Sequence, residues 1–171
     1  MPVTLQGPLA DADRAELGEG RPIDRTSDLL ARRSTVLLLR EAWYGTSRYD
    51  DFVRRTGLTA SVVAAQLRSL VDATLLEKRP YREPGQRARF EYVLTAAGAE
   101  LAPLLVAFAS WGDRHLPRSH RLGMTHAGCG AQIQVDVRCA AGHAVADEEI
   151  IVGLERAGAS GSSHESEWEL S

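Results

Sequence analysis

The stretch from Leu58 to Thr95 decides the fold, and it reads "LTASVVAAQLRSLVDATLLEKRPYREPGQRARFEYVLT". In its first half Thr59 can cap a helix whose apolar residues recur at helical spacing on one stripe, namely Val63, Leu67, Leu70 and Val71. From Tyr81 onward, two alternating runs of aromatic and aliphatic residues are joined by a Pro-Gly turn. This pattern predicts a β-hairpin directly after the helix.

The face of this helix that lies away from the stripe or at its edge is small and lightly polar. Its residues are Ser61, Val62, Ala65, Gln66, Arg68 and Ser69. An ordinary solvated helix carries more Lys and Glu on such a face. The short side chains would let the helix approach another surface closely.

The segments before this stretch are also predicted to be helical. Residues from Asp24 to Gly45 place apolar side chains at helical spacing and predict two helices that meet near Arg33. A short helix is predicted next, with Ser47 as its N-cap and Gly57 as its C-terminal glycine.

After the hairpin, the sequence from Ala96 to His115 predicts a long apolar helix, which Pro103 should start or kink. The fold class is therefore mainly α with a small β-hairpin, in the order of a winged helix-turn-helix. In that arrangement the helix from Thr59 enters the major groove of double-stranded DNA, and the hairpin lies against the adjacent phosphates.

The 171 residues suit one domain plus an appendage. We predict a flexible N-terminal arm over residues 1–20, a DNA-binding and dimerisation domain over 21–117, a small appendage containing Cys and His over 118–156, and a disordered acidic tail over 157–171.

The formal net charge of −3 hides two regions of opposite sign. From Arg48 to Arg89 there are nine basic and five acidic residues, whereas from Ala144 to Ser171 there are seven acidic residues and one basic residue. Such an asymmetry fits a basic face and a solvated tail, although charge runs are more often plain surface. The longest apolar runs are too short to span a bilayer and the N-terminus lacks an apolar signal segment, so we expect a cytoplasmic protein without membrane contact.

Four ordered pieces of the chain, "LLREAWYGTSRYDDF", "GLTASVVAAQLRSLVDATLLEKRPY", "YREPGQRARFEYVLTAAGAELAPLL" and "WGDRHL", resemble the HxlR-type bacterial transcriptional regulators. The resemblance runs from about Arg21 to Leu116. It implies a homodimer in which the long helix joins helical segments near the N-terminus, so that two recognition helices engage a pseudo-palindromic operator. The dimerisation residues would be the apolar stripe of that helix: Leu101, Leu104, Leu105, Phe108 and Trp111.

The chain departs from this family at three positions. Some members carry a redox-sensing cysteine where this chain has Arg21, which puts thiol sensing by that route in doubt. A usual tryptophan is replaced by Ser34, and a usual glycine before the hairpin is replaced by Thr74.

Phosphate contacts supply affinity, and contacts to base edges supply sequence preference. Arg48 and the hairpin arginines Arg82, Arg87 and Arg89 are therefore assigned to phosphate or minor-groove contacts, the alternative being ordinary exposed arginines. Gln66 could bond an adenine edge, Ser61 either kind of base, and Val62 and Ala65 a thymine methyl. The complete DNA-binding set is Arg48, Thr59, Ser61, Val62, Ala65, Gln66, Arg68, Ser69, Arg82, Arg87 and Arg89.

The segment "THAGCGAQIQVDVRCAAGHAV" holds a second group of chemically active residues. His126, Cys129, Cys139 and His143 form two closely spaced pairs, and ligands of these types could wrap a tetrahedral structural zinc ion in a ribbon-like appendage. The alternatives are a small hairpin without metal and a disulfide between the cysteines, which a reducing cytoplasm disfavours. A catalytic zinc ion is disfavoured because no carboxylate base has the usual spacing.

A dimeric DNA-binding regulator is the leading hypothesis for the function, and no motif of an enzyme is visible. The rival is a winged-helix protein-interaction module that does not read DNA. A small-molecule effector is compatible with the first hypothesis, since the dimer helices could enclose an apolar pocket near Trp43, Phe108 and Trp111. The plainer interpretation is that these aromatic residues belong to the core.

Overall fold

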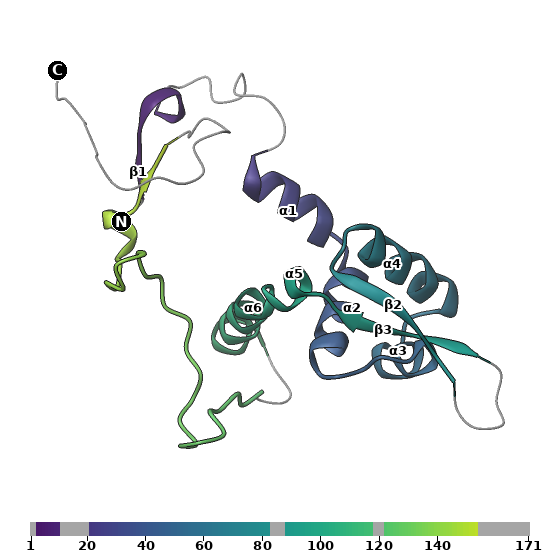
Figure 1. The fold of residues 1–171 in the computed structure, drawn as a ribbon. Coiled ribbons are helices and arrows are strands. Elements are labelled where there is room, and N and C mark those ends of the chain that lie inside the picture. The colour runs from purple at the N-terminus through teal and green to yellow at the C-terminus, as the bar shows by residue number, and fades with distance from the viewer. Residues whose placement is uncertain (1–2, 11–20, 83–87, 118–121, 154–171) are drawn as a thin grey trace. The chain divides into compact units, whose positions relative to one another are not determined.

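The computed structural model describes residues 3–10, 21–82, 88–117 and 122–153 (Figure 1). The chain forms two compact units, residues 21–135 and residues 1–20 together with 136–171. The boundary after residue 20 coincides with the predicted end of the arm. The boundary after residue 135 falls inside the predicted appendage. Within the described ranges, no helix has the length and apolar character needed to span a membrane.

The larger unit is a helical domain with one antiparallel hairpin, so the predicted fold class is confirmed. Its elements are α1 (Pro22–Leu30), α2 (Arg33–Trp43), α3 (Tyr49–Thr56), α4 (Ala60–Asp72), β2 (Leu76–Tyr81), β3 (Arg89–Leu94), α5 (Ala96–Ala99) and α6 (Ala102–His115). In the hairpin, Leu76 lies opposite Leu94 and Tyr81 opposite Arg89. The hairpin extends from the helices beside α4 and α3 (Figure 1).

The core lies where α2, α3, α4 and the start of β2 meet. The largest side chains that are fully buried there are Leu38, Leu39, Phe52, Val63, Leu67, Leu70 and Leu76. Burying each of them stabilises the fold by about 1.5–3 kcal/mol relative to exposure. The predicted inner stripe of the helix from Thr59 is thus largely confirmed, with Val71 only partly buried.

Two of the predicted helix ends are confirmed and one is wrong. The Thr59 hydroxyl accepts a hydrogen bond from the Val62 amide at 3.4 Å, as an N-cap does, and Gly57 ends α3 with a φ of 67°. The N-cap of α3 is Arg48 rather than Ser47, and no side chain caps this helix. Ser47 instead belongs to the connection with the hairpin, because its carbonyl accepts the Tyr92 amide at 2.8 Å.

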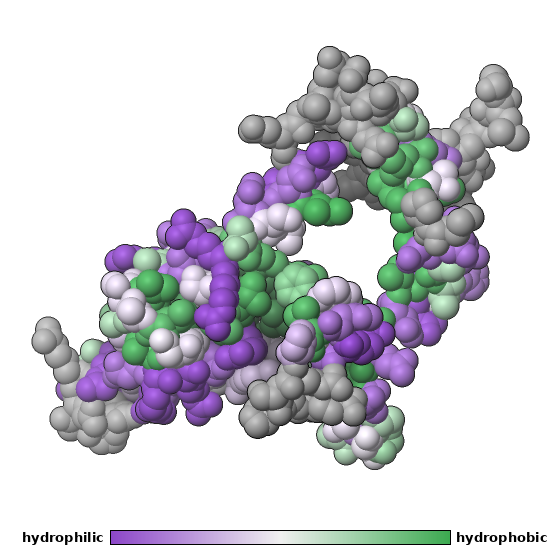
Figure 2. Space-filling view, turned by 180° about the vertical axis from the view of Figure 1, so that it is seen from behind, coloured by the Kyte–Doolittle hydropathy of each residue, from purple (hydrophilic) through white to green (hydrophobic). Residues whose placement is uncertain are grey.

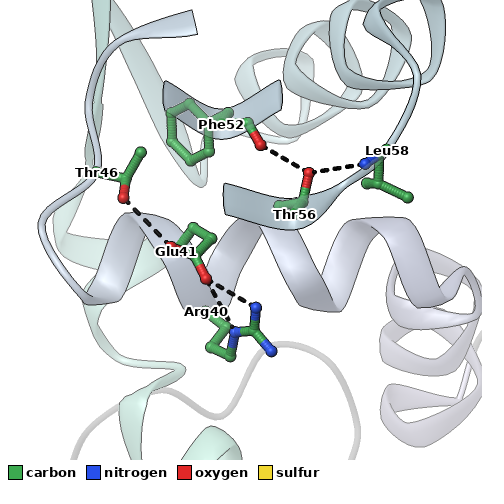
Figure 3. A network of polar contacts seen from close by, with 6 residues as sticks. All are labelled: Arg40, Glu41, Thr46, Phe52, Thr56 and Leu58. Carbon is green, nitrogen blue, oxygen red and sulfur yellow. Dashed lines mark hydrogen bonds and ion pairs between the residues drawn. The ribbon is translucent and has the colours of Figure 1, made fainter. Parts of the chain in front are cut away.

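Polar contacts fix the turn between α2 and α3 (Figure 3). Glu41 is buried, and its carboxylate accepts hydrogen bonds from the Arg40 guanidinium at 2.7 and 3.2 Å and from the Thr46 hydroxyl at 3.4 Å. At the end of α3, the Thr56 hydroxyl donates to the Phe52 carbonyl at 2.7 Å. A buried carboxylate without partners would be costly, so these bonds let α2 and α3 pack closely.

The turn from α4 into β2 passes through Thr74, which has a φ of 58°. This is the left-handed region, which costs a β-branched residue about 1–2 kcal/mol. The Thr74 carbonyl is held in place by the Thr95 hydroxyl, which donates to it at 2.6 Å. The position where the family usually has glycine therefore does adopt a conformation that favours glycine.

The long helix predicted after the hairpin is divided into α5 and α6. Thr95 caps α5 by accepting the Gly98 amide at 3.0 Å, and Pro103 lies in the first turn of α6. The expectation that Pro103 starts or kinks a helix is confirmed, since proline is tolerated where the amide has no intrahelical partner.

The smaller unit contains a short parallel pair of strands, β1 (Thr4–Leu5) and β4 (Ile151–Val152). Two 3-10 turns, Gly7–Leu9 and Asp147–Glu149, lie next to these strands in the sequence. The prediction of a flexible arm is thus wrong for Thr4–Leu5, because a strand from the far end of the chain supplies the backbone partners that the arm lacks locally. Residues 11–20 of the arm and the predicted acidic tail lie outside the described residues.

Candidate nucleic-acid interface

The outer face of α4 is accessible over most of its length. Five of its predicted DNA-contacting residues are exposed: Ser61, Val62, Ala65, Arg68 and Ser69. Thr59 is also exposed, but its hydroxyl caps the helix and lies 3.2 Å from the Ser61 hydroxyl. The small side chains leave the backbone of α4 open to close approach by a broad surface.

Gln66 differs from the prediction. Only 9% of this residue is exposed, and its side-chain oxygen accepts a hydrogen bond from the buried Thr35 hydroxyl at 2.8 Å. Gln66 therefore lies on the inner side of α4, where it joins this helix to α2. A base-reading role does not fit this conformation, because the side-chain oxygen is already bound within the domain.

A cleft of about 520 Å³ lies between α3 and the hairpin. Its lining combines basic, aromatic and acidic side chains: Arg48, Arg54, Lys78, Arg89, Tyr49, Tyr81, Phe90, Tyr92, Asp50 and Asp51. The Arg48 guanidinium lies over the Tyr81 ring at 5.1 Å, and the Lys78 ammonium lies over the Phe90 ring at 4.0 Å. These contacts hold two cations in place on the wall of the cleft.

The structure brings together only some of the predicted arginines. Arg48 and Arg89 line the cleft, and Arg82 is exposed just beyond β2, whereas Arg87 lies outside the described residues. Sequence reasoning missed Arg54 and Lys78. Lys78 could have been found from the hairpin register, which places it opposite Tyr92.

Tyr92 links the cleft to α4 electrostatically. Partial burial raises the pKa of the Tyr92 hydroxyl, Tyr49 raises it further, and the positive charge of Arg68 lowers it. Arg68 of α4 is thus close enough to act on a side chain of the hairpin. The cleft also adjoins the start of α4 directly, because the hydroxyl of Tyr49, which lines the cleft, donates a hydrogen bond to the Ala60 carbonyl at 2.7 Å.

The predicted dimerisation helix α6 is only partly covered. Phe108 and Trp111 are 52% and 54% exposed, while Leu101, Leu104 and Leu105 are half-buried. Leu101 packs against the core, and the Trp111 and His115 rings lie 5.2 Å apart. The interpretation that Phe108 and Trp111 are core residues is wrong. The space-filling view shows hydrophobic residues, coloured green, at the surface alongside hydrophilic ones, coloured purple (Figure 2).

The predicted metal ligands lie on two turns. His126 Nδ1 is 3.3 Å from Cys129 Sγ, and the Cys139 amide donates to the His143 carbonyl at 3.1 Å. Both cysteines are exposed and free of disulfide bonds. In the part of the chain that the structure describes, no three His, Cys, Asp or Glu side chains are gathered closely enough to hold a metal ion.

The helices α2, α3 and α4 followed by the hairpin β2–β3, with an exposed face on α4 and basic side chains beside the hairpin, define a winged helix-turn-helix protein of the DNA-binding class. The family model described as HxlR-like helix-turn-helix matches residues 29–120, more than half of the chain. The chain belongs to this family of transcriptional regulators.

Relatives and solved structures agree with this assignment. The chain is 32% identical over 133 residues to Rv3095 of Mycobacterium tuberculosis strain H37Rv, which is named as an uncharacterized HTH-type transcriptional regulator; the match covers 77% of this chain and 83% of the relative. It is 26% identical over 105 residues to YdeP of Bacillus subtilis strain 168, which bears the same kind of name; this match covers 61% of this chain and 80% of YdeP. The crystal structure of PA1607, described as a candidate transcription factor, matches with a TM-score of 0.67 and 27% identity over 80% of this chain and 97% of that chain. PA1374 from Pseudomonas aeruginosa, described in the same way, matches with a TM-score of 0.58 and 28% identity over 82% and 96% of the two chains.

Proposed function

We propose that the chain regulates transcription as a homodimer, in which two α4 helices enter successive major grooves of a pseudo-palindromic operator. The observation that carries this proposal is the exposed, small outer face of α4 together with the basic cleft that adjoins the start of this helix through the bond between Tyr49 and Ala60. A helix with short outer side chains fits a groove, and the flanking cations suit the phosphates on its rim.

The residues of this surface divide into two roles. Arg48, Arg54, Lys78, Arg82 and Arg89 would contact phosphates, with Arg87 added from the sequence. Ser61, Val62, Ala65, Arg68 and Ser69 would contact base edges from α4. Gln66 has a positioning role in this scheme, because its bond to Thr35 fixes α4 against α2.

Two exposed apolar regions support the homodimer. Phe108 and Trp111 lie on α6, and Ile23 on α1 is 78% exposed. Large apolar side chains left uncovered in one chain indicate a surface that a partner covers. A second copy is the partner that would also supply the second α4 helix, which the family resemblance implies.

The same proposal includes a cytoplasmic location, where the operator would be found, and a regulatory rather than catalytic role. It also includes control by a small-molecule effector. An apolar pocket for this effector would form only in the dimer, when α6 and its neighbours near Trp43 are covered.

In vitro selection of random DNA, followed by footprinting and sedimentation of the complex, tests the proposal. We expect an enriched site with two symmetric half-sites about 10–11 base pairs apart or a multiple of this spacing, bound by two chains. Failure to enrich any sequence, together with a monomer in sedimentation, would favour the protein-interaction module instead.

Adjacent residues on β2 provide a matched test of the cleft. Lys78 lines the cleft, whereas the next residue, Arg79, points to the opposite face of the hairpin and pairs with Glu77. We expect Lys78→Ala to weaken binding to all DNA sequences several-fold and Arg79→Ala to have little effect. Equal losses for the two variants would show that the cleft is not where the phosphates bind.

A further inference from the structure

Tyr49 is the first residue of α3, and it reaches two other parts of the domain. Its side chain lines the cleft beside the hairpin, and its hydroxyl donates a hydrogen bond to the Ala60 carbonyl at 2.7 Å. Ala60 is the first residue of α4. One side chain of α3 therefore lies both at the cleft proposed to bind phosphates and at the start of the helix proposed to read bases.

The first turn of α4 lies at the surface. Residues 59–62 are all exposed, and Val63 is the first buried residue of the helix. The bond that caps the helix, from the Val62 amide to the Thr59 hydroxyl, is long at 3.4 Å and lies within the turn itself. The 2.7 Å bond from Tyr49 is shorter and comes from another helix, so it can fix where this turn lies in the domain.

The hairpin is joined to the residues just before Tyr49. The Tyr92 amide donates to the Ser47 carbonyl at 2.8 Å, and Arg48 forms an antiparallel bridge with Glu91. These are backbone contacts, so they fix the position of β3 relative to the start of α3. The hairpin, the start of α3 and the first turn of α4 are thus connected in series, with Tyr49 as the last link.

We propose that Tyr49 is a positioning residue for DNA recognition, whose hydroxyl sets where the first turn of α4 lies relative to the basic cleft. This inference rests on the proposed function. The N-terminal residues of a recognition helix contact base edges, and each hydrogen bond to a base depends on its distance and angle. Contacts from Ser61 and Val62 would therefore depend on the Tyr49 hydroxyl, whereas phosphate contacts from the cleft would not.

Tyr49→Phe tests the inference, because it keeps the ring in the cleft and removes only the hydroxyl. We expect affinity for the site enriched by in vitro selection to fall at least about threefold, since each bound chain loses a hydrogen bond worth a factor of about 2 to 12. Affinity for scrambled DNA of the same length should change less than about twofold, because phosphate contacts supply nonspecific binding. A merely structural role would lower both affinities together, so their ratio is the quantity measured.

Tyr81→Phe is the matched control. Tyr81 also lines the cleft, where its ring lies beneath the Arg48 guanidinium, and the substitution removes a hydroxyl while keeping that ring. We expect the ratio of the affinities for the enriched site and for scrambled DNA to stay unchanged. An equal fall of the ratio in Tyr81→Phe and Tyr49→Phe would contradict a special role for the bond to Ala60.

Hydrogen exchange of the free protein gives a second readout that needs no DNA. The Val63 amide, which donates to the Thr59 carbonyl at 3.0 Å, reports on the start of α4. Tyr49→Phe should speed exchange at Val63 about threefold or more, because local opening of this turn no longer breaks the bond to Ala60. Exchange at Leu70, a buried residue near the end of the helix, should change little.

Failure of this inference and failure of the proposed function give different results. If the unaltered protein prefers no DNA sequence, the proposed function is wrong and the inference falls with it. If the unaltered protein has a preference and Tyr49→Phe keeps the same ratio of affinities, the inference is overturned and the proposed function stands. Unchanged exchange at Val63 would also overturn the inference, because the hydroxyl would then not hold the start of α4.

Discussion

The helices α4 and α6 are both amphipathic, but they dispose of their apolar surface differently. In α4 the side chains of Val63, Leu67 and Leu70 are completely buried within the domain, which leaves a small polar face outside. In α6 only Val106 is buried, and Phe108 and Trp111 remain mostly exposed. The comparison teaches that the apolar side of α4 is buried by its own chain, so that its other side is free to face DNA. The apolar side of α6 is left exposed, and in the proposed homodimer the second chain would cover it.

The largest expected effect is a difference between the two helices in stability. Leu67→Ala removes a fully buried side chain from α4 and should lower the free energy of unfolding by about 2–5 kcal/mol. Phe108→Ala removes a larger side chain from α6 but should cost less than about 1 kcal/mol at concentrations where the protein is monomeric, because the ring is exposed. Urea denaturation of both variants measures the two effects, and similar losses would contradict the comparison.

The next effect concerns association. Phe108→Ala and Trp111→Ala should each weaken the homodimer by about 2 kcal/mol or more, since exposed aromatic residues at an interface contribute most of its binding energy. Sedimentation equilibrium over a range of protein concentrations measures this change. Arg114→Ala, on an exposed residue near the end of the same helix, serves as the control. An unchanged dimer in both aromatic variants would show that α6 is not the interface.

A smaller effect separates the two sides of α4. Gln66→Ala leaves the buried Thr35 hydroxyl without its partner and should lower the free energy of unfolding by about 1–3 kcal/mol. Ser69→Ala on the exposed side should change stability by less than about 0.5 kcal/mol. In a double-mutant cycle with Thr35→Val, Gln66→Ala should cost less than it does alone. Additive losses would mean that the bond between Thr35 and Gln66 contributes no stability.

The smallest expected effect is a gain. Thr74→Gly should raise the free energy of unfolding by about 1 kcal/mol, because glycine adopts a φ of 58° without steric cost. Thermal unfolding measures the shift. A destabilised variant would show that contacts of the Thr74 side chain outweigh the backbone strain.

The sequence predicted the helix-turn-helix well because its signals are local. Thr59 and Gly57 mark helix ends through their own backbone preferences, and the alternation around the Pro-Gly turn marks the hairpin. Gln66 was assigned to the wrong side because it stands three residues after Val63, at the border of the apolar stripe. What places it inside is a partner 31 residues away in the sequence, which no local pattern reveals.

Partners that are distant in the sequence also explain the other differences between the sequence predictions and the structure. Thr4–Leu5 is a strand only because Ile151–Val152 pairs with it, and Ser47 does not cap α3 because its backbone is bonded to Tyr92 in the hairpin. Arg54 and Lys78 join the cleft from separate elements. Contacts between distant parts of the chain, rather than local propensity, decided each of these positions.

The central claim is that α4 and the basic cleft bind DNA, and fluorescence anisotropy with the promoter of the protein's own gene tests it most directly. The titration is repeated at several salt concentrations, with scrambled DNA as a control and with Ala65→Glu, which places a negative charge on the exposed face of α4. We predict tight binding to the promoter that weakens steeply as salt rises, and loss of this binding in Ala65→Glu. Binding that is absent at low salt, or that Ala65→Glu leaves unchanged, would contradict the claim.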